Sequence, residues 1–491
     1  MKKLSFFIII LVCTSLSAQN YPSLNNQKIN GYKGIWFLVA SRAYSGGLGT
    51  YTEYHTPLAI YSPEVQKTFF VFGGTIEGRK SNLSVWPPTV GSEYGDYLLC
   101  MVGCFDHKTQ TVSKPTVVHD KGGIHDPHEN STIAMDADGY IWVFVNGRGS
   151  IPSRPGTIYK SRQPYNVDAF DLIDTQVGLA YAQPKYVKDK GFIVPFTYYY
   201  GNYGNRQLQF ITSPDGHTWS EKQLLFDILQ SPESGEKRGG HYQTSGQWGE
   251  KIGFFCQWLF WSNNILSLHH MNTNLYYLQT VDFGKTWTKA DGSPVSLPVT
   301  EADDETLVRE FLSKNQHCYV KDMTFDEKGN PMLLYLYGTG RGAALDAGWG
   351  MKTWAVLYWN GKEWENHDIT TSDHNWDMGS IWTTNGKWSV IAPTDPGPQT
   401  WHTGGELVLW ESTDNGNTWK RTKQVTKNSP RNHTYARKVI NGVDPFMYFW
   451  ADGNADEPSI SKLYFGDSKG NVWQLPYTMT KDTQKPQKGQ K

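Results

Sequence analysis

The stretch HENSTIAMDADGYIWVFV, residues 128–145, contains two apolar runs on either side of a short polar turn. The runs, 131–135 and 140–144, are rich in β-branched and aromatic residues, which favour strands. The turn, DADG at 136–139, is typical of a hairpin, because Asp hydrogen-bonds to nearby backbone and Gly accepts a positive φ. The stretch therefore predicts a β-hairpin that begins just after His128.

The order of strand, turn and strand recurs along the chain, and in most copies a histidine again precedes the first strand. The copies begin at His55, His128, Tyr181, His241, His317, His374 and His433. Their spacing of roughly 60 residues is long enough for four short strands with their turns, which make one blade of a β-propeller. We therefore predict an all-β protein that folds as a seven-bladed β-propeller.

A second repeated motif supports this prediction. Asp215, Asp282 and Asp414 each lie in a short segment that runs from Ser or Thr through Asp and Gly to Thr-Trp. In such a turn the Asp side chain accepts hydrogen bonds from the backbone, and the Trp packs on the next layer. We interpret these motifs as structural turns that take no part in chemistry.

The composition excludes several classes of function. The 491 residues include 46 Lys and Arg against 47 Asp and Glu, which gives a net charge of -1. This charge would attract neither nucleic acid nor an anionic membrane surface. Charged residues are 19% and aromatic residues 14% of the chain, a balance that disfavours disorder and long helical bundles. We expect a monomer with neither nucleic acid nor membrane as a partner.

The N-terminus has the pattern of a secretory signal peptide. Lys2 and Lys3 precede an apolar run at 4–12, and small residues lead to Ala18. The apolar run is too short to span a bilayer. The protein is therefore expected to be exported, either to the periplasm or to the medium. The predicted divisions are a signal peptide at 1–18, a single catalytic propeller domain at 19–480 and a polar C-terminal tail at 481–491.

The histidines that begin the repeats suggest a site at one end of the propeller. The innermost strand of each blade lines the central channel, so residues that precede these strands would meet at one mouth of it. Histidine transfers protons near neutral pH. We take His55, His128 and His241 as catalytic candidates, and His317 and His374 as substrate-binding candidates. The alternative is that each histidine only caps its strand and bonds to the neighbouring blade.

Arginines beside glycines and tyrosines point to an anionic ligand at the same mouth. Arg148 lies in NGRG, residues 146–149, and Arg206 follows a loop rich in Gly, Asn and Tyr. A guanidinium group suits carboxylate or sulfate, and Tyr242 would contact the sugar. No close pair of metal ligands such as HxH or HExxH occurs. We predict no required cofactor and no catalytic metal, and leave a structural calcium ion in the channel open.

Several segments resemble the BNR-repeat propeller enzymes that act on carbohydrates. These segments are GYKGIWF at 31–37, YSGGLGTY at 44–51, KTFFVFGG at 67–74, HDPHEN at 125–130 and NGRG at 146–149. The resemblance is to rhamnosyl-glucuronate lyases and α-L-rhamnosidase-like proteins, and more distantly to propeller ulvan lyases. It implies an enzyme acting on rhamnose and uronic acid linkages of plant or algal polysaccharide. The site residues that it implies are His55, His128, His241, Arg148 and Arg206, with Tyr199 as a looser match for an acid or base.

The candidate residues suit β-elimination from a uronic acid. This reaction needs a base for the proton next to the carboxylate, a cation to neutralise the carboxylate, and an acid for the leaving oxygen. Histidine, arginine, and tyrosine or histidine fill these roles in turn. A glycosyl leaving group would make the enzyme a polysaccharide lyase, and a hydroxyl leaving group would make it an oligosaccharide dehydratase. Both stay open, with an acidic polysaccharide or oligosaccharide, sulfated or not, as the substrate.

Two functions from other classes remain as alternatives. A glycoside hydrolase of the α-L-rhamnosidase type would need two placed carboxylates, and Asp126 and Glu129 are the acids beside the predicted ring of histidines. A sugar-binding propeller without turnover is the other alternative, although a ring of histidines is an unusual choice for simple binding.

Overall fold

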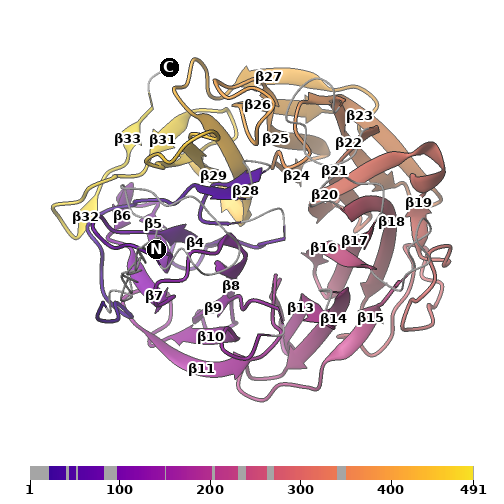
Figure 1. The fold of residues 1–491 in the computed structure, drawn as a ribbon, viewed down its shortest axis with the longest axis horizontal. Coiled ribbons are helices and arrows are strands. Elements are labelled where there is room, and N and C mark those ends of the chain that lie inside the picture. The colour runs from indigo at the N-terminus through magenta and orange to yellow at the C-terminus, as the bar shows by residue number, and fades with distance from the viewer. Residues whose placement is uncertain are drawn as a thin grey trace, which may run out of the picture.

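The strands of the computed structural model form a ring of twisted sheets around a central axis, as Figure 1 shows. The structure describes residues 21–39, 44–50, 54–81, 97–149, 151–201, 205–229, 239–261, 270–339 and 350–489. Within these ranges the helical elements are two short 3₁₀ turns, η1 (Pro127–Glu129) and η2 (Leu312–Lys314). The predicted all-β class is confirmed.

Consecutive strands form antiparallel groups. In the first half of the ring the groups are β3 (Ala59–Ser62), β4 (Lys67–Gly74), β5 (Leu99–Asp106), β6 (Thr111–Ser113) and β7 (Thr116–Asp120); β8 (Ser131–Met135), β9 (Ile141–Val145), β10 (Gly156–Ser161) and β11 (Phe170–Gln176); and β12 (Lys185–Val187), β13 (Gly191–Tyr200), β14 (Asn205–Ser213) and β15 (Gln223–Phe226).

The second half continues in the same way. Its groups are β16 (Gly239–Trp248), β17 (Lys251–Trp261), β18 (His270–Thr280) and β19 (Leu307–Arg309); β20 (Gln316–Phe325), β21 (Pro331–Thr339), β22 (Lys352–Trp359) and β23 (Trp364–Ser372); β24 (Ser380–Thr384), β25 (Lys387–Asp395), β26 (Glu406–Ser412) and β27 (Lys420–Gln424); and β28 (Asn432–Val443), β29 (Phe446–Gly453), β30 (Leu463–Gly466) and β31 (Val472–Gln474). A separate pair is formed by β1 (Phe37–Val39) and β2 (Tyr44–Gly46).

Two single parallel pairings connect neighbouring groups. Arg206 of β14 pairs with Gly240 of β16, and Ile440 of β28 pairs with Ile60 of β3. The second pairing joins a strand near the C-terminal end of the described chain to one near its start. It therefore closes the ring.

The predicted hairpin at 128–145 is formed by β8 and β9. Their register runs from Ser131 opposite Val145 to Met135 opposite Ile141. In the turn, the Asp136 carboxylate accepts hydrogen bonds from the backbone N–H groups of Asp138 at 3.1 Å and Tyr140 at 2.8 Å. The local sequence thus determines the hairpin, as expected.

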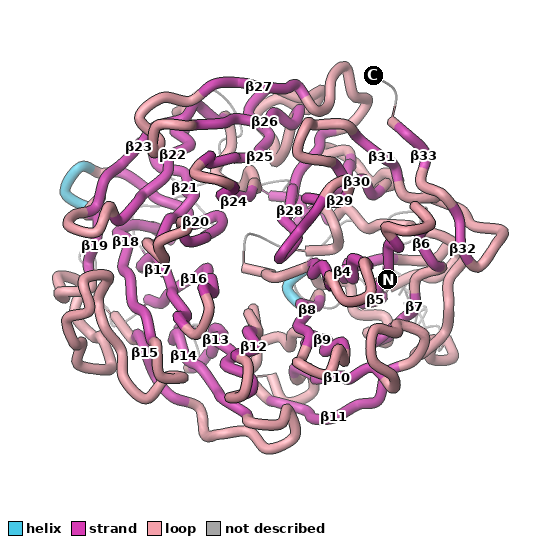
Figure 2. The backbone as a smooth tube through the Cα atoms, turned by 180° about the vertical axis from the view of Figure 1, so that it is seen from behind, coloured by secondary structure: helices cyan, strands magenta, loops and turns pink. Residues whose placement is uncertain are grey.

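The first strands of five of the repeated hairpins lie on the inside of the ring (Figure 1). In Figure 1, β8, β16, β20, β24 and β28 surround the central opening, and β11, β15, β19, β23 and β27 form the rim. The view from behind in Figure 2 shows the same order. Residues that begin the inner strands therefore share one end of the central channel.

The three Asp motifs are turns, as predicted. Asp215 accepts hydrogen bonds from the N–H groups of His217 at 2.8 Å and Thr218 at 2.7 Å. Asp282 and Asp414 each accept both the N–H and the hydroxyl group of the Thr four residues later. The following tryptophans pack on aromatic rings, such as Trp287 against Phe210 and Phe254. These hydrogen bonds fix turns of the blades, and the motifs contain none of the predicted site residues.

The structure describes most of the predicted C-terminal tail, whereas the predicted signal peptide lies outside the described residues. The predicted tail contains β32 (Thr483–Gln484), which pairs with β6, and β33 (Gln487–Lys488), which pairs with β31. Residues 483–484 and 487–488 therefore pair with strands of the ring. Within the described ranges no helix is both long and apolar enough to cross a membrane.

Candidate active site

His128 is fixed in place by the short turn that precedes β8. Asp126 caps η1, and Pro127 occupies its first position, where a missing N–H costs nothing. The Asp126 carboxylate accepts hydrogen bonds from the backbone N–H of His128 at 3.0 Å and from its Nδ1 at 2.5 Å. Because Nδ1 donates to a carboxylate, the Nε2 atom carries the lone pair and can accept a proton.

A buried ion-pair network surrounds this turn. Asp126 pairs with the Nε atom of Arg148 at 3.1 Å and with Arg154 at 2.5 Å, and Glu129 pairs with Lys121 at 2.6 Å and with Arg154. Both carboxylates are fully buried. Charges buried in this way persist because partners compensate for lost hydration. The network holds Asp126, and through it the imidazole of His128.

The electrostatic surroundings keep His128 neutral at pH 7. Burial, together with the positive charge of Arg148, lowers the pKa of His128 to about 4, and Asp126 opposes the shift. Burial alone would raise the pKa of Asp126, but His128 and Arg148 outweigh it and hold that pKa well below its usual range. The pair is therefore a neutral imidazole beside a carboxylate.

His55 lies in the segment that precedes β3 and contacts the backbone of His128. Its Nε2 atom lies 3.2 Å from the backbone carbonyl of His128, so Nε2 carries the proton and donates it to that oxygen. Its ring meets the ring of Tyr181 edge-on at 5.4 Å, and the ring of His128 lies 6.0 Å from the same tyrosine. The two histidines thus flank Tyr181.

Four tyrosines pack around these histidines. Tyr54 stacks on Tyr242 with ring centroids 4.2 Å apart, and Tyr181 meets Tyr54 at 5.2 Å and Tyr242 at 5.9 Å. The hydroxyl group of Tyr199 donates to that of Tyr181 at 3.4 Å. The result is an aromatic site with phenol and imidazole groups close together.

Two guanidinium groups lie against Tyr199. Arg206 is 5.0 Å from the ring centroids of both Tyr199 and Tyr242, and Arg148 is 5.7 Å from that of Tyr199. Burial raises the pKa of Tyr199, but the positive charges of Arg206 and Arg148 outweigh it and hold that pKa below its ordinary value. Tyr199 is thereby a stronger acid than a tyrosine in water.

Six of the predicted site residues therefore lie together. They are His55, His128, Arg148, Tyr199, Arg206 and Tyr242. Tyr54 and Tyr181 join them, although neither was predicted as a site residue. The available signals were the adjacency of Tyr54 to His55 and the place of Tyr181 in the series of repeat starts.

The other predicted histidines are held by structural contacts. His241 follows the alternation of β16, so its ring faces Phe226 at 5.4 Å and its Nε2 accepts the backbone N–H of Ile228 at 3.0 Å. Burial lowers its pKa to about 3. The structure places His241 apart from Tyr242, on the opposite side of the strand.

His317 and His374 also have neighbours outside the tyrosine cluster. The ring of His317 stacks on Tyr319 at 6.2 Å. His374 accepts the backbone N–H of Trp376 at its Nδ1 atom, at 3.2 Å. These contacts of His317 and His374 are thus with Tyr319 and Trp376, which belong to neither the tyrosine cluster nor the six residues above. Within the described ranges, no group of three or more His, Cys, Asp or Glu side chains is arranged to hold a metal ion.

A comparison with protein-family models matches residues 103–372 to the BNR repeat-containing family. The match spans more than half of the chain, and it includes His128, Arg148, Tyr199 and Arg206. The chain belongs to the BNR repeat-containing family. The resemblance seen in the sequence segments is confirmed.

Known proteins similar to this BNR repeat protein include ulvan lyases. The ulvan lyase of Alteromonas sp. (strain LOR) is 22% identical over 403 residues, which cover 76% of this chain and 79% of that protein. The structure of a PL25 ulvan lyase bound to -[GlcA(1-4)Rha3S]- matches with a TM-score of 0.68 at 16% identity, over 90% of this chain and 96% of the other. The polysaccharide lyase Uly1 matches with a TM-score of 0.57 at 13% identity, over 92% and 99%. These likenesses confirm the β-propeller arrangement.

Proposed function

We propose that this protein is an exported carbon–oxygen lyase that cleaves an acidic polysaccharide by β-elimination. The observation that carries the proposal is the buried group formed by His128, Tyr199 and Arg206, with Asp126 behind the histidine. It combines a neutral imidazole, an acidified phenol and a guanidinium group. These are the three kinds of group that elimination from a uronate requires.

Arg206 is assigned to the substrate carboxylate. Its guanidinium group lies between the rings of Tyr199 and Tyr242, whereas Arg148 is already paired with Asp126. A positive charge at the carboxylate stabilises the electron density that builds up when the neighbouring proton leaves. Arg148 acts on Tyr199 instead, because its positive charge helps to lower the pKa of that phenol.

His128 is assigned as the base and Tyr199 as the acid. The proton on C5 of the uronate passes to Nε2 of His128, and the electron pair of that C–H bond forms the C4–C5 double bond. The C4–O bond breaks, and the leaving oxygen takes the hydroxyl proton of Tyr199. Asp126 stabilises the imidazolium that forms, as the carboxylate does in a serine protease triad.

The substrate class follows from the acid chemistry and from the relatives. The polysaccharide is proposed to contain uronic acid next to rhamnose, in agreement with the ulvan lyase similarity and with the glycan bound to the PL25 enzyme. Export to the periplasm or medium, where such polymers are met, agrees with the N-terminal pattern at residues 1–18.

The proposal also includes a ring of seven blades and a monomeric protein. If each of the two single parallel pairings joins two blades, the strand groups correspond to the seven repeats of the sequence. A single closed ring of this kind carries its whole site within one chain.

The decisive experiment follows the ultraviolet absorbance of unsaturated uronate during incubation with ulvan, with masses of all products recorded. Rising absorbance with shorter chains supports the lyase. Loss of water from an oligosaccharide without cleavage would identify a dehydratase. A gain of one water per cut, without absorbance, would contradict β-elimination and identify a hydrolase. If the protein is a lyase, we expect Arg206→Gln to remove the activity and Lys188→Met, a change at an exposed lysine, to retain it.

A further inference from the structure

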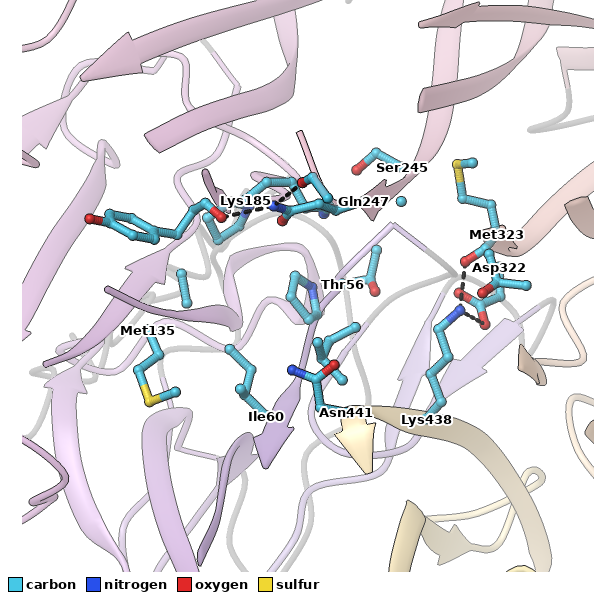
Figure 3. Close-up of a pocket in the computed structure, with 18 residues that line it drawn as sticks. Thr56, Ile60, Met135, Lys185, Ser245, Gln247, Asp322, Met323, Lys438 and Asn441 are labelled. Atoms are coloured by element: carbon cyan, nitrogen blue, oxygen red, sulfur yellow. Dashed lines mark hydrogen bonds and ion pairs between the residues drawn. The ribbon is translucent and has the colours of Figure 1, made fainter. Parts of the chain in front are cut away.

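The central channel contains a cavity whose lining residues are distinct from the tyrosine cluster. The cavity has a volume of about 370 Å³ and is lined by inner-strand residues that include Lys185, Asp322 and Lys438 (Figure 3). On β16, Tyr242 belongs to the tyrosine cluster, and the nearest cavity residue of the same strand is Ser245. Three residues of strand separate them by roughly 10 Å along the channel. The cavity therefore lies further along the channel than the cluster.

Gln183 lies between the cluster and the cavity. It is fully buried, and its side-chain amide donates to the carbonyl groups of Tyr54 and Gln243, both at 3.0 Å. Its side-chain oxygen accepts the hydroxyl group of Ser245 at 2.6 Å. Gln183 thus contacts both the cluster, through Tyr54, and the cavity lining, through Ser245, and its amide is satisfied by these protein partners.

The two lysines of the cavity differ in how their charges are satisfied. Lys438 uses all three donor directions, toward the carbonyl groups of Met323 at 2.5 Å and Ile381 at 2.9 Å and toward the carboxylate of Asp322 at 2.9 Å. Its charge is thus neutralised by Asp322, which also accepts the backbone N–H of Ile381.

Lys185 has no such neutralisation. Its side chain donates one hydrogen bond, to the carbonyl group of Gln183 at 3.2 Å, and within the described residues no carboxylate lies at ion-pair distance from it. The residue is only 7% exposed. A buried ammonium group with two unused donors beside a cavity is costly unless an anion or water reaches it.

We propose that this cavity is a second binding site, which takes a small carboxylate whose anionic group pairs with Lys185. When Lys185 is protonated, the charged lining residues sum to one positive charge, because Asp322 balances Lys438. The remaining wall includes apolar side chains such as Ile60, Met135 and Met323, which suit a carbon skeleton. The volume falls in the range of small-molecule sites and exceeds what a single inorganic ion fills.

The electrostatics of Lys185 agree with an anionic ligand. Burial, and next the charge of Lys438, lower the pKa of Lys185 to about 7, with Asp322 opposing the shift. A carboxylate bound beside the ammonium group would favour its charged form. Binding would then be accompanied by proton uptake.

Calorimetric titration with D-glucuronate tests the proposal, with D-glucose as the uncharged control. Since a uronate also suits the proposed active site, the titration is made on the Arg206→Gln protein as well as on the natural protein. We expect glucuronate to bind Arg206→Gln protein, and the further change Lys185→Met to weaken that binding at least tenfold. Lys188→Met, a change at an exposed lysine three residues away, leaves it unaltered.

Equal binding of glucuronate with and without Lys185, or equal binding of glucose and glucuronate, would overturn the second site. Binding lost with Arg206→Gln alone would assign the ligand to the active site and also overturn it. If Lys185→Met does not fold, the test is instead the extent to which acetic anhydride labels the amine of Lys185 in the natural protein, with and without ligand. Protection of Lys185 by glucuronate, and not by glucose, supports the site, and equal labelling contradicts it. Neither readout depends on turnover, so the lyase proposal can fail separately.

Discussion

At the residue scale, Asp126 controls which nitrogen of His128 is available. The 2.5 Å contact with Nδ1 leaves Nε2 as the proton acceptor, and the negative charge raises a pKa that burial lowers. In Asp126→Asn the imidazolium is no longer stabilised, and the amide can reverse the tautomer. We expect kcat to fall by about 10²–10⁴-fold.

The measurement is kcat on ulvan across pH, with Asp138→Asn in the exposed turn as the control. In the natural protein the acidic limb of the profile should lie near the pKa of about 4 of His128. In Asp126→Asn the limb moves lower, because the carboxylate that favours the charged imidazole is gone. An acidic limb near 6.5 in both proteins would contradict the assignment of His128 as the base.

Tyr199 supplies a second prediction at this scale. Tyr199→Phe keeps the ring against Arg206 and removes only the hydroxyl group, so substrate binding should persist while kcat falls by about 10²–10⁴-fold. Tyr198→Phe, the neighbour whose ring packs between blades on the other face of β13, is the matched control. Substrate affinity is measured by titration with an oligosaccharide. Full activity of the Tyr199 variant would exclude it as the acid.

At the scale of single elements, the Asp motifs stabilise turns, and we expect them to affect the stability of the fold and not the activity of the site. Asp282 accepts the N–H group of Thr286 at 3.0 Å and its hydroxyl group at 2.6 Å. Asp282→Ala leaves both donors without this acceptor, and we expect a loss of about 1–2 kcal/mol in the free energy of unfolding. Urea unfolding measures it, with Asp303→Ala at an exposed position as control. An altered kcat with unchanged stability would contradict the structural role.

The same scale explains what the sequence could predict. Hairpins such as β8–β9 depend on local residue patterns and turn chemistry, so the repeats are recognisable in the sequence alone. The side toward which a residue points depends on register. His241 and Tyr242 are neighbours on β16, and only the second faces the tyrosine cluster. Tyr54 and Tyr181 reach the site through packing between distant segments, and in the sequence they are marked only by the adjacency of Tyr54 to His55 and by the place of Tyr181 in the series of repeat starts.

At the scale of the whole molecule, the C-terminal segment helps to close the ring. Thr483 of β32 pairs with Ser113 of β6, and β33 pairs with β31. Ending the chain at residue 480 removes both pairings and exposes two strand edges. We expect a lower urea midpoint and more aggregation than in the full chain, measured by unfolding and light scattering. Equal stability of both proteins would show that these short strands contribute little to closure.

Buried histidines also make the stability of the whole ring depend on pH. His128 and His241 have pKa values of about 4 and about 3, below the ordinary 6.5. Their neutral forms favour folding, so this stability is complete above pH 6.5 and is lost as the pH falls toward the folded-state values. Between these limits the unfolded chain binds more protons, and each histidine contributes a slope of up to about 1.4 kcal/mol per pH unit.

Urea unfolding at pH 7, 6 and 5 tests this dependence. The free energy of unfolding should decrease at each step, and His241→Gln should reduce the slope, since one buried group that takes up a proton on unfolding is gone. His217→Gln at an exposed turn should leave the slope unchanged. A stability that is constant from pH 7 to pH 5 would mean that these imidazoles take up protons without unfolding. The lowered pKa of about 4 for His128 would then be wrong as well.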